Sequence, residues 1–271
     1  MLSDFTLDLP KPGVYCVFGR SGCGKSLVAK VLARQVRPQS GTVKVRGADL
    51  AKQPARALSD MAFAFEESGP PENMRALDYI YYFAEVNGIR NPEARTRLQA
   101  WFPPAMVEAW SSGWLLEMPS SARRIVEAAK ALALARPVVV IDGVFGIVSD
   151  AEGQTLLDAL AKYAADERLA LIFSPRPPHS SEALAGVFEM KGGSVQPAGA
   201  AIHGAGGLVT VAFGSFTYRA LQVVDGSAPF EVVQTFDEGV RLRPKGGLSD
   251  VVAFFEERGI AIKSLTVEEG G

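Results

Sequence analysis

The chain has 271 residues, of which 48% are hydrophobic and 21% are charged, and its formal net charge is −2. At roughly 150 residues per domain, this length predicts one large domain, or a large domain with a small one, and the composition excludes wholesale disorder. The low net charge argues against a protein that binds nucleic acid or anionic membranes through bulk electrostatics.

Targeting and cysteine patterns point to a cytosolic protein. No apolar stretch approaches the ~18 residues of a membrane span, and the N-terminus lacks the basic start and apolar centre of a signal peptide. Cys16 and Cys23 lie close together, without the spacing of a disulfide framework or a zinc site. We therefore expect a protein of a reducing compartment.

Predicted strands and helices alternate along the first 190 residues. The predicted strands are apolar or alternating runs at 14–18, 42–46, 61–65, 138–142 and 169–173. Helices are predicted at 27–37, 120–136 and 150–164, with a helical, aromatic-rich stretch from about 70 to 118. Ser120 or Ser121 is the expected N-cap of the second of these helices. The alternation predicts an α/β protein with a mainly parallel sheet.

The composition changes after residue 191. Residues 192–207 are rich in Gly and Ala without apolar periodicity, which favours a linker. Beyond it, strands are predicted at 208–213, 230–236, 240–242 and 260–267, with a helix at 249–258. We expect a main domain over residues 1–195, with a helical subdomain at about 70–118, and a small α+β domain over 208–271.

A glycine-rich motif follows the first predicted strand and precedes the first helix. It fits the pattern G-x-x-x-x-G-K-[ST] with Gly19, Arg20, Ser21, Gly22, Cys23, Gly24, Lys25 and Ser26. Glycines let successive backbone N–H groups turn toward phosphates, and the helix N-terminus adds positive potential. Lys25 would reach the β- and γ-phosphates, and the Ser26 hydroxyl would ligate Mg²⁺. The alternative is a chance glycine-rich turn.

Asp142 ends the predicted strand 138–142. An acid in this place, downstream of a phosphate-binding loop, would help to hold the Mg²⁺ ion. The alternative is an ordinary solvated Asp at a strand end.

With these residues in place, the chain resembles the ATPase subunits of ABC transporters. The resemblance rests on the loop at 19–26, on the run P-x-S-G-T-V-K-V-R-G-A-D-L at 38–50 and on the alanine-rich segment 128–137, and it covers about residues 1–200. The C-terminal part resembles, more weakly, the small appended domain of some bacterial ABC export ATPases. A GTPase is a poorer match, because we find no Asn-Lys-x-Asp motif.

The resemblance implies a P-loop ABC-type ATPase fold, with a mainly parallel sheet and a helical subdomain. It also implies ATP and Mg²⁺ as cofactors, a membrane-spanning permease and a second ATPase subunit as partners, and no nucleic acid. The location implied is cytoplasmic, peripheral on the inner face of the cell membrane. Residues 77–83 begin the segment that docks a helix of the membrane subunit in this family; internal packing of these aromatics is the alternative. The chain begins too late for the family's first strand and its adenine-stacking aromatic.

Two positions depart from the family pattern at the hydrolytic site. Gly143 stands where active members have the Glu that polarises the attacking water, a loss that costs ~10²–10⁴-fold in rate. Pro175 stands where the switch histidine is expected. His179 lies about 12 Å further along an extended, proline-rich chain.

Two further positions depart from the pattern elsewhere. The signature Leu-Ser-Gly-Gly-Gln, which contacts the γ-phosphate held by the partner subunit, aligns with the segment from Met118 to Ala122. Pro119 there lacks an N–H, and both glycines are replaced. Glu66 stands in place of the family's metal-sensing glutamine, where it adds like charge beside a triphosphate.

These departures are consistent with one another, because the phosphate-binding residues are kept and the residues expected to act in hydrolysis are replaced. We expect a subunit that binds Mg-ATP and hydrolyses it poorly or not at all. It would pair with itself or, in the arrangement that we favour, with a complete ATPase subunit. One alternative is a nucleotide-independent scaffold. Another is an active ATPase in which Glu66 or Glu67 is the base and His179 the sensor.

Overall fold

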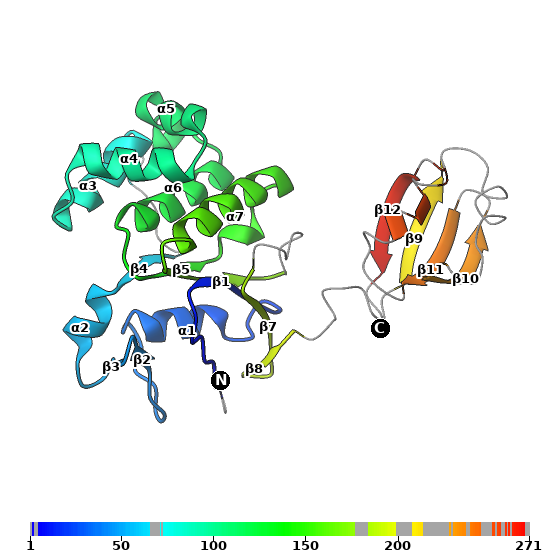
Figure 1. The fold of residues 1–271 in the computed structure, drawn as a ribbon, viewed down its shortest axis with the longest axis horizontal. Helices are drawn as coiled ribbons and strands as arrows, with labels where there is room; N and C mark the ends of the chain where they lie inside the picture. The colour runs from blue at the N-terminus through cyan, green and yellow to red at the C-terminus, as the bar shows by residue number, and fades with distance from the viewer. Residues whose placement is uncertain are drawn as a thin grey trace. The chain divides into compact units, whose positions relative to one another are not determined.

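The computed structural model folds as two compact units, Met1–Pro197 and Ala198–Gly271, whose elements are drawn in Figure 1. In the first unit it describes residues 2, 5–65, 71, 73–176 and 184–197. In the second it describes residues 198, 208–213, 228, 230–236, 239–244, 251–252, 254–255, 258, 260 and 262–268. Each unit is described by itself.

A six-stranded sheet forms the centre of the first unit. Its order is β4 (Met61–Ala64), β5 (Val138–Asp142), β6 (Leu169–Ser174), β1 (Gly13–Phe18), β7 (Gly186–Lys191) and β8 (Ser194–Pro197). Every neighbouring pair is parallel except β7 with β8. The expected α/β fold with a mainly parallel sheet is therefore confirmed.

Helices cover both faces of this sheet, and successive strand residues divide between the two sides. In β5, Val139 and Ile141 pack into the core that includes α6 (Ser120–Ala133) and α7 (Asp150–Ala164). Val140, between them, packs into the core that includes α1 (Lys25–Leu32). Figure 1 shows α6 and α7 on one side and α1 on the other. Strands buried on both faces explain the continuous apolar runs.

The helical stretch expected between residues 70 and 118 is confirmed. It comprises α3 (Ala76–Val86), α4 (Asn91–Trp101), α5 (Pro104–Ser112) and a short 3₁₀ turn, η1 (Leu115–Glu117). Above the sheet, α3 packs against α5 and α6 (Figure 1).

A buried polar triad joins α3 to α6. The Tyr79 hydroxyl donates to Glu127 Oε1 (2.5 Å), and Lys130 Nζ donates to Glu127 Oε2 (2.6 Å) and to the Tyr79 oxygen (3.2 Å). Lys130 Nζ also lies 4.6 Å from the Phe83 ring centre. Burial, followed by the Glu127 carboxylate, raises the pKa of Tyr79. All three polar side chains are therefore partnered, which a buried charge requires.

Three predicted element boundaries were wrong. The first helix ends at Leu32 instead of 37, because Arg34 adopts a left-handed backbone with φ 59°. The helix predicted to reach residue 136 ends at Ala133, and Ala135 is left-handed with φ 48°. The strand predicted at 42–46 is shorter than expected and comprises β2 (Lys44–Val45) alone. It pairs with β3 (Ala48–Asp49) in a short antiparallel hairpin. A short helix, α2 (Pro54–Ser59), follows it.

The segment predicted as a linker begins inside the sheet. Gly192 and Gly193 have φ values of 60° and 86°, and they turn the chain from β7 into the antiparallel strand β8. Residues 199–207 lie outside the described residues.

The second unit contains a four-stranded antiparallel sheet in the order β10 (Phe230–Phe236), β11 (Gly239–Pro244), β9 (Leu208–Phe213) and β12 (Ile262–Glu268). Of the helix predicted at 249–258, residues 251–252 and 254–255 are helical. Phe255 and Phe230 stack at 5.2 Å in the core of this unit. Within the described part of the whole chain, no helix combines the length and apolarity needed to cross a bilayer.

Candidate functional site

The candidate site lies where three neighbouring parallel strands end. The register pairs Asp142 of β5 with Phe173 of β6, and Phe18 of β1 with Ser174. Successive carbonyls of β6 hold both loops that leave this edge: the Phe173 oxygen accepts from the Gly143 N–H (3.3 Å), and the Ser174 oxygen accepts from the Gly19 N–H (3.2 Å). In open α/β sheets, this carboxyl edge is where ligands bind.

The glycine-rich loop joins β1 directly to α1. Helix α1 begins at Lys25, and its N-cap is Gly24, so no side chain caps the helix. N–H groups at such an uncapped terminus attract anions. Lys25 Nζ donates to the carbonyl oxygens of Gly19 (2.5 Å) and Arg20 (3.0 Å). Two carbonyl groups at the start of the loop are thus directed toward the Lys25 ammonium.

Two glycines of the loop are constrained, Gly19 by close backbone packing and Gly24 by its left-handed conformation. A Cβ at Gly19 would lie 2.4 Å from the carbonyl oxygen of Met190, in β7. At Gly24, where φ is 113°, it would lie 2.7 Å from Leu2 Cδ2. Gly22 has φ 80° but open space around it. The glycines are needed for close approach at one end of the loop and for left-handed backbone at the other.

The two cysteines lie in different surroundings. Cys16 is fully buried in β1, and burial raises its pKa to about 12. Cys23 is partly exposed, and its Sγ lies 3.6 Å from Lys25 Nζ. Cys23, which belongs to the motif, is therefore part of the loop surface, whereas Cys16 belongs to the core.

Asp142 and Gly143 follow one another at the end of β5. Asp142 is buried, with 4% of its surface exposed. Gly143 turns the chain into the 3₁₀ helix η2 (Val144–Gly146) with φ 79° and ψ −1°. A residue with a Cβ is strained in this left-handed conformation. The position at which the resemblance predicts a catalytic carboxylate thus carries a glycine whose left-handed backbone forms the turn into η2.

The end of β6 carries no base within the described residues. The buried Ser174 hydroxyl donates to the Arg176 carbonyl and accepts from the Arg176 N–H, which closes a short turn around Pro175. The Pro175 ring lies against Gly146. His179, Glu66 and Glu67 lie outside the described residues, so their roles stay predictions.

The start of α6 shows that the expected serine N-cap was wrong. Pro119 is the N-cap, and no side chain caps the helix. Ser121 is the second helical residue, and its hydroxyl donates to Glu152 Oε1 (2.9 Å) instead. Ser120 is exposed. The segment aligned with the signature thus has a proline as its second residue, and Ser121 is hydrogen-bonded within the chain.

Sequence reasoning missed Glu152. Ser149 and Glu152 form a reciprocal capping box at the start of α7, in which Glu152 accepts from the Ser149 N–H (2.8 Å) and hydroxyl (2.8 Å). These hydrogen bonds, the backbone one first, lower the pKa of Glu152. The S-x-x-E spacing before a predicted helix is a recognisable signal for this box, but nothing local predicts the bond to Ser121.

The aromatic segment is divided between core and surface. Leu77, Tyr79 and Ile80 are buried, whereas Tyr82 is 55% exposed. Exposed residues recur on one face of α3, at Arg75, Asp78, Tyr82 and Val86. At one end of this face, Trp114 is 42% exposed and stacks under the Arg75 guanidinium at 5.4 Å. We call these residues the α3 face.

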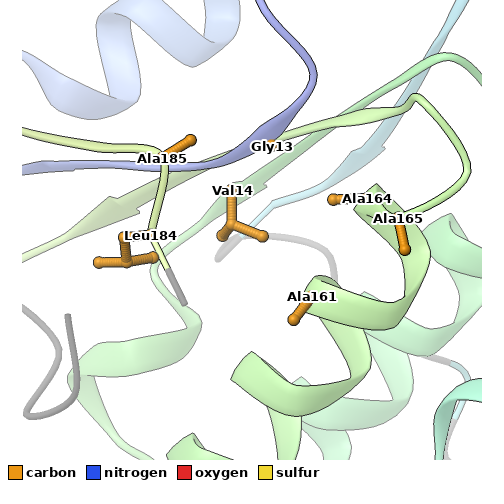
Figure 2. A pocket seen from close by; sticks show the side chains of 7 residues that line it. All are labelled: Gly13, Val14, Ala161, Ala164, Ala165, Leu184 and Ala185. Atoms are coloured by element: carbon orange, nitrogen blue, oxygen red, sulfur yellow. The ribbon is translucent and has the colours of Figure 1, made fainter. Parts of the chain in front are cut away.

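A shallow hollow lies at the opposite end of β1 from the loop. It is lined by the small or apolar residues Gly13, Val14, Ala161, Ala164, Ala165, Leu184 and Ala185 (Figure 2). Since none of these side chains carries a polar atom, the hollow contributes no chemistry to the site.

A family model described as "ABC transporter" matches residues 2–145. The chain is 28% identical over 141 residues to Fe(3+) ions import ATP-binding protein FbpC 1 of Rhizobium meliloti (strain 1021), covering 52% of this chain and 40% of that protein. It is 24% identical over 177 residues to the glycine betaine/proline betaine transport system ATP-binding protein ProV of Escherichia coli (strain K12), covering 64% and 44%. It thus spans less than half the length of these curated relatives.

Solved structures share the fold. The ATP binding subunit of an ABC transporter superposes with a TM-score of 0.61 at 19% identity, covering 72% of this chain and 81% of that one. The ADP conformation of MJ1267, an ATP-binding cassette of an ABC transporter, gives a TM-score of 0.62 at 17% identity, covering 72% and 83%.

Proposed function

The chain belongs to the ABC transporter family, and from this premise we propose that it is a nucleotide-binding subunit that holds Mg-ATP but hydrolyses it poorly or not at all. The observation that carries the second half is Gly143. It directly follows the buried Asp142, and its left-handed backbone disfavours any residue with a side chain.

The residues at the carboxyl edge fit Mg-ATP. Backbone N–H groups of the loop from Gly19 to Ser26, with the Lys25 ammonium, would hold the phosphates. The Ser26 hydroxyl and the Asp142 carboxylate are oxygen donors of the kind that Mg²⁺ prefers. Bound Mg²⁺ would neutralise phosphate charge. The close packing of Gly19 against Met190 supports this assignment, because it holds the loop at the strand ends.

The start of α6 supports an unequal pair of ATPase subunits. Pro119 offers no N–H to a phosphate, and Ser121 is hydrogen-bonded to Glu152. In a mixed pair, this chain would hold ATP under the intact signature of its partner and would give little to the partner's nucleotide. A pair of identical chains would have no working site.

The α3 face supports a membrane-spanning permease as the other partner. Tyr82 and Val86 expose apolar surface along α3, and Trp114 adds to it beside Arg75 at the start of that helix, which fits the apolar side of a docking helix. The relatives are named as ATP-binding proteins of import or transport systems. By this proposal the chain lies in the cytoplasm, on the inner face of the cell membrane.

Calorimetric titration with Mg-ATP, with phosphate release followed on the same sample, tests the proposal. We expect saturable binding to the purified chain and no turnover above that of Lys25→Ala, with circular dichroism confirming that the variant folds. Turnover that Lys25→Ala abolishes would favour an active enzyme with substitute groups, and Glu66→Gln would then identify the base. The absence of binding at millimolar nucleotide would favour a scaffold.

A further inference from the structure

Positive charge is concentrated at one end of the sequence. Residues 1–60 contain ten Lys or Arg and four Asp or Glu, whereas the remaining residues contain 18 and 26. The formal net charge of −2 therefore conceals an excess of six positive charges in the first 60 residues. Such an asymmetry indicates an anionic partner for that region.

The structure brings much of this charge to one subregion. The end of α1, the β2–β3 hairpin and α2 all pack into the hydrophobic core on one side of the sheet, through residues that include Leu32, Val45 and Ala57, and α2 packs against β3. They lie on the same side of the main sheet (Figure 1). Six basic residues on these segments are exposed, and we call them the basic surface: Arg34, Arg37, Lys44, Arg46, Lys52 and Arg56.

Little of this charge is neutralised nearby. Among ion pairs between described residues, the basic surface contributes one, in which Arg46 lies 3.7 Å from Asp60 with 60% of the Arg46 side chain exposed. Asp49, opposite Lys44 in the hairpin, accepts the Ala51 and Lys52 N–H groups and also attracts the Lys52 and Lys44 ammonium groups. Asp49 and Asp60 together offset two of the six positive charges of the basic surface. Exposed ion pairs of this kind are weak, so these positive charges can still attract an anionic partner.

An apolar side chain lies among the cations. Val36 is 38% exposed, and it lies between Arg34 and Arg37 directly after α1. Arg34 adopts a left-handed backbone, so the chain turns here and extends outward as exposed residues 34–42. Cations beside an exposed apolar residue match a membrane interface, where headgroups take the charge and the acyl boundary takes the apolar group.

We propose that the basic surface binds the anionic headgroups of a phospholipid bilayer directly. The described residues of this surface include no aromatic side chain to stack a base, which argues against single-stranded nucleic acid. This contact is additional to the proposed permease partner and does not depend on bound nucleotide.

Co-sedimentation of the full chain with vesicles tests the proposal. The probes are vesicles of phosphatidylcholine alone and of phosphatidylcholine with about one third phosphatidylglycerol. We expect binding to the anionic vesicles only, weakened by added salt because surface charge is screened. Each cation contributes roughly fivefold to such binding, so the triple variant Arg34→Gln, Arg37→Gln, Lys44→Gln should bind about 100-fold more weakly.

A matched variant controls for total charge. Arg90→Gln, Lys191→Gln and Arg243→Gln remove three positive charges from other exposed positions, and we expect binding to change less than threefold. Equal losses in both triple variants, or no binding of the unmodified chain to anionic vesicles, would overturn the proposal. Tighter binding to duplex RNA than to anionic vesicles, lost in the first variant alone, would also overturn it.

The outcome is separable from the proposed function. None of the substituted residues belongs to the phosphate-binding loop, so calorimetry should find Mg-ATP binding unchanged in both triple variants. If the first triple variant loses vesicle binding and keeps nucleotide binding, the result supports the lipid contact, whether or not the chain hydrolyses ATP. Loss of both in the first variant would show a damaged fold, and single substitutions at Arg37 and Lys44, each expected to cost about fivefold, would then decide the question.

Discussion

The loop after β1 and the segment from Met118 to Ala122 differ in how their residues are used. In the loop, Gly19 permits close packing against β7, Gly24 is the N-cap of α1, and the Lys25 ammonium donates to the loop carbonyls. At the start of α6, the hydroxyl of Ser121 is instead bonded to Glu152 of the same chain. Under the proposed function, nucleotide binding and hydrolysis depend on groups from these two different segments, so one can be kept while the other is lost.

The largest expected effect comes from removing the cation of the loop. Lys25→Ala should weaken Mg-ATP binding by about 10- to 100-fold, since a hydrogen bond to a charged group is worth about 1.5–3 kcal/mol. Calorimetry measures the change. Lys52→Ala, which removes a distant exposed charge, should leave the affinity unchanged. If Lys25→Ala binds Mg-ATP as tightly as the unmodified chain, the loop does not bind the phosphates as proposed, and the two regions do not differ in this respect.

The loop should also tolerate little added volume. Gly19→Ala places a methyl group against the Met190 carbonyl and should destabilise the fold by about 1–3 kcal/mol, as overpacking does. Gly22→Ala meets open space and suffers only left-handed backbone strain, which costs about 1 kcal/mol. Urea denaturation compares the two, and a smaller cost at Gly19 would contradict the packing argument.

Restoring a carboxylate at Gly143 sharpens the comparison. Gly143→Glu should still show no turnover above Lys25→Ala, because the signature segment lacks its backbone donors. It should also lose about 1 kcal/mol of stability, given the φ of 79°. Gly143→Asn should lose less, since Asn tolerates the left-handed region. Strong ATP turnover in Gly143→Glu would contradict this expectation, because the loss of hydrolysis would then be due to residue 143 alone.

The smallest effect is expected at the start of α6. Ser121→Ala should cost about 1 kcal/mol through the lost bond to Glu152, whereas Ser120→Ala at the exposed neighbouring position should cost nothing measurable. The pKa of Glu152 is lowered in the folded state. Its carboxylate therefore stabilises the fold above the unfolded pKa of about 4.3, and this stability is lost as pH falls through the folded value.

Urea denaturation at two pH values checks this linkage. The difference in unfolding free energy between the unmodified chain and Glu152→Gln should be largest at pH 7 and should shrink by pH 3. A difference that grows in acid would reverse the sign of the linkage and contradict the hydrogen bonds seen at Glu152.

The sequence predicted the features that depend on neighbouring residues. The loop from Gly19 to Ser26 is one continuous motif, and the buried strands are continuous apolar runs, so both were visible without tertiary information. Helix ends were not, because propensity carried the first helix to residue 37 while the backbone turned at Arg34. The bond from Ser121 to Glu152 joins residues 31 positions apart and follows only from how α6 packs beside α7.

The buried triad of Tyr79, Glu127 and Lys130 has a consequence for how the helical subdomain opens. Separating α3 from α6 would take the Tyr79 hydroxyl away from the Glu127–Lys130 ion pair of α6 and leave each buried charge one hydrogen bond short, so neither helix can detach cheaply while the other stays. In native-state hydrogen exchange, amides of the two helices should share one opening free energy and behave as one cooperative unit. Tyr79→Phe should lower that shared value in both helices together.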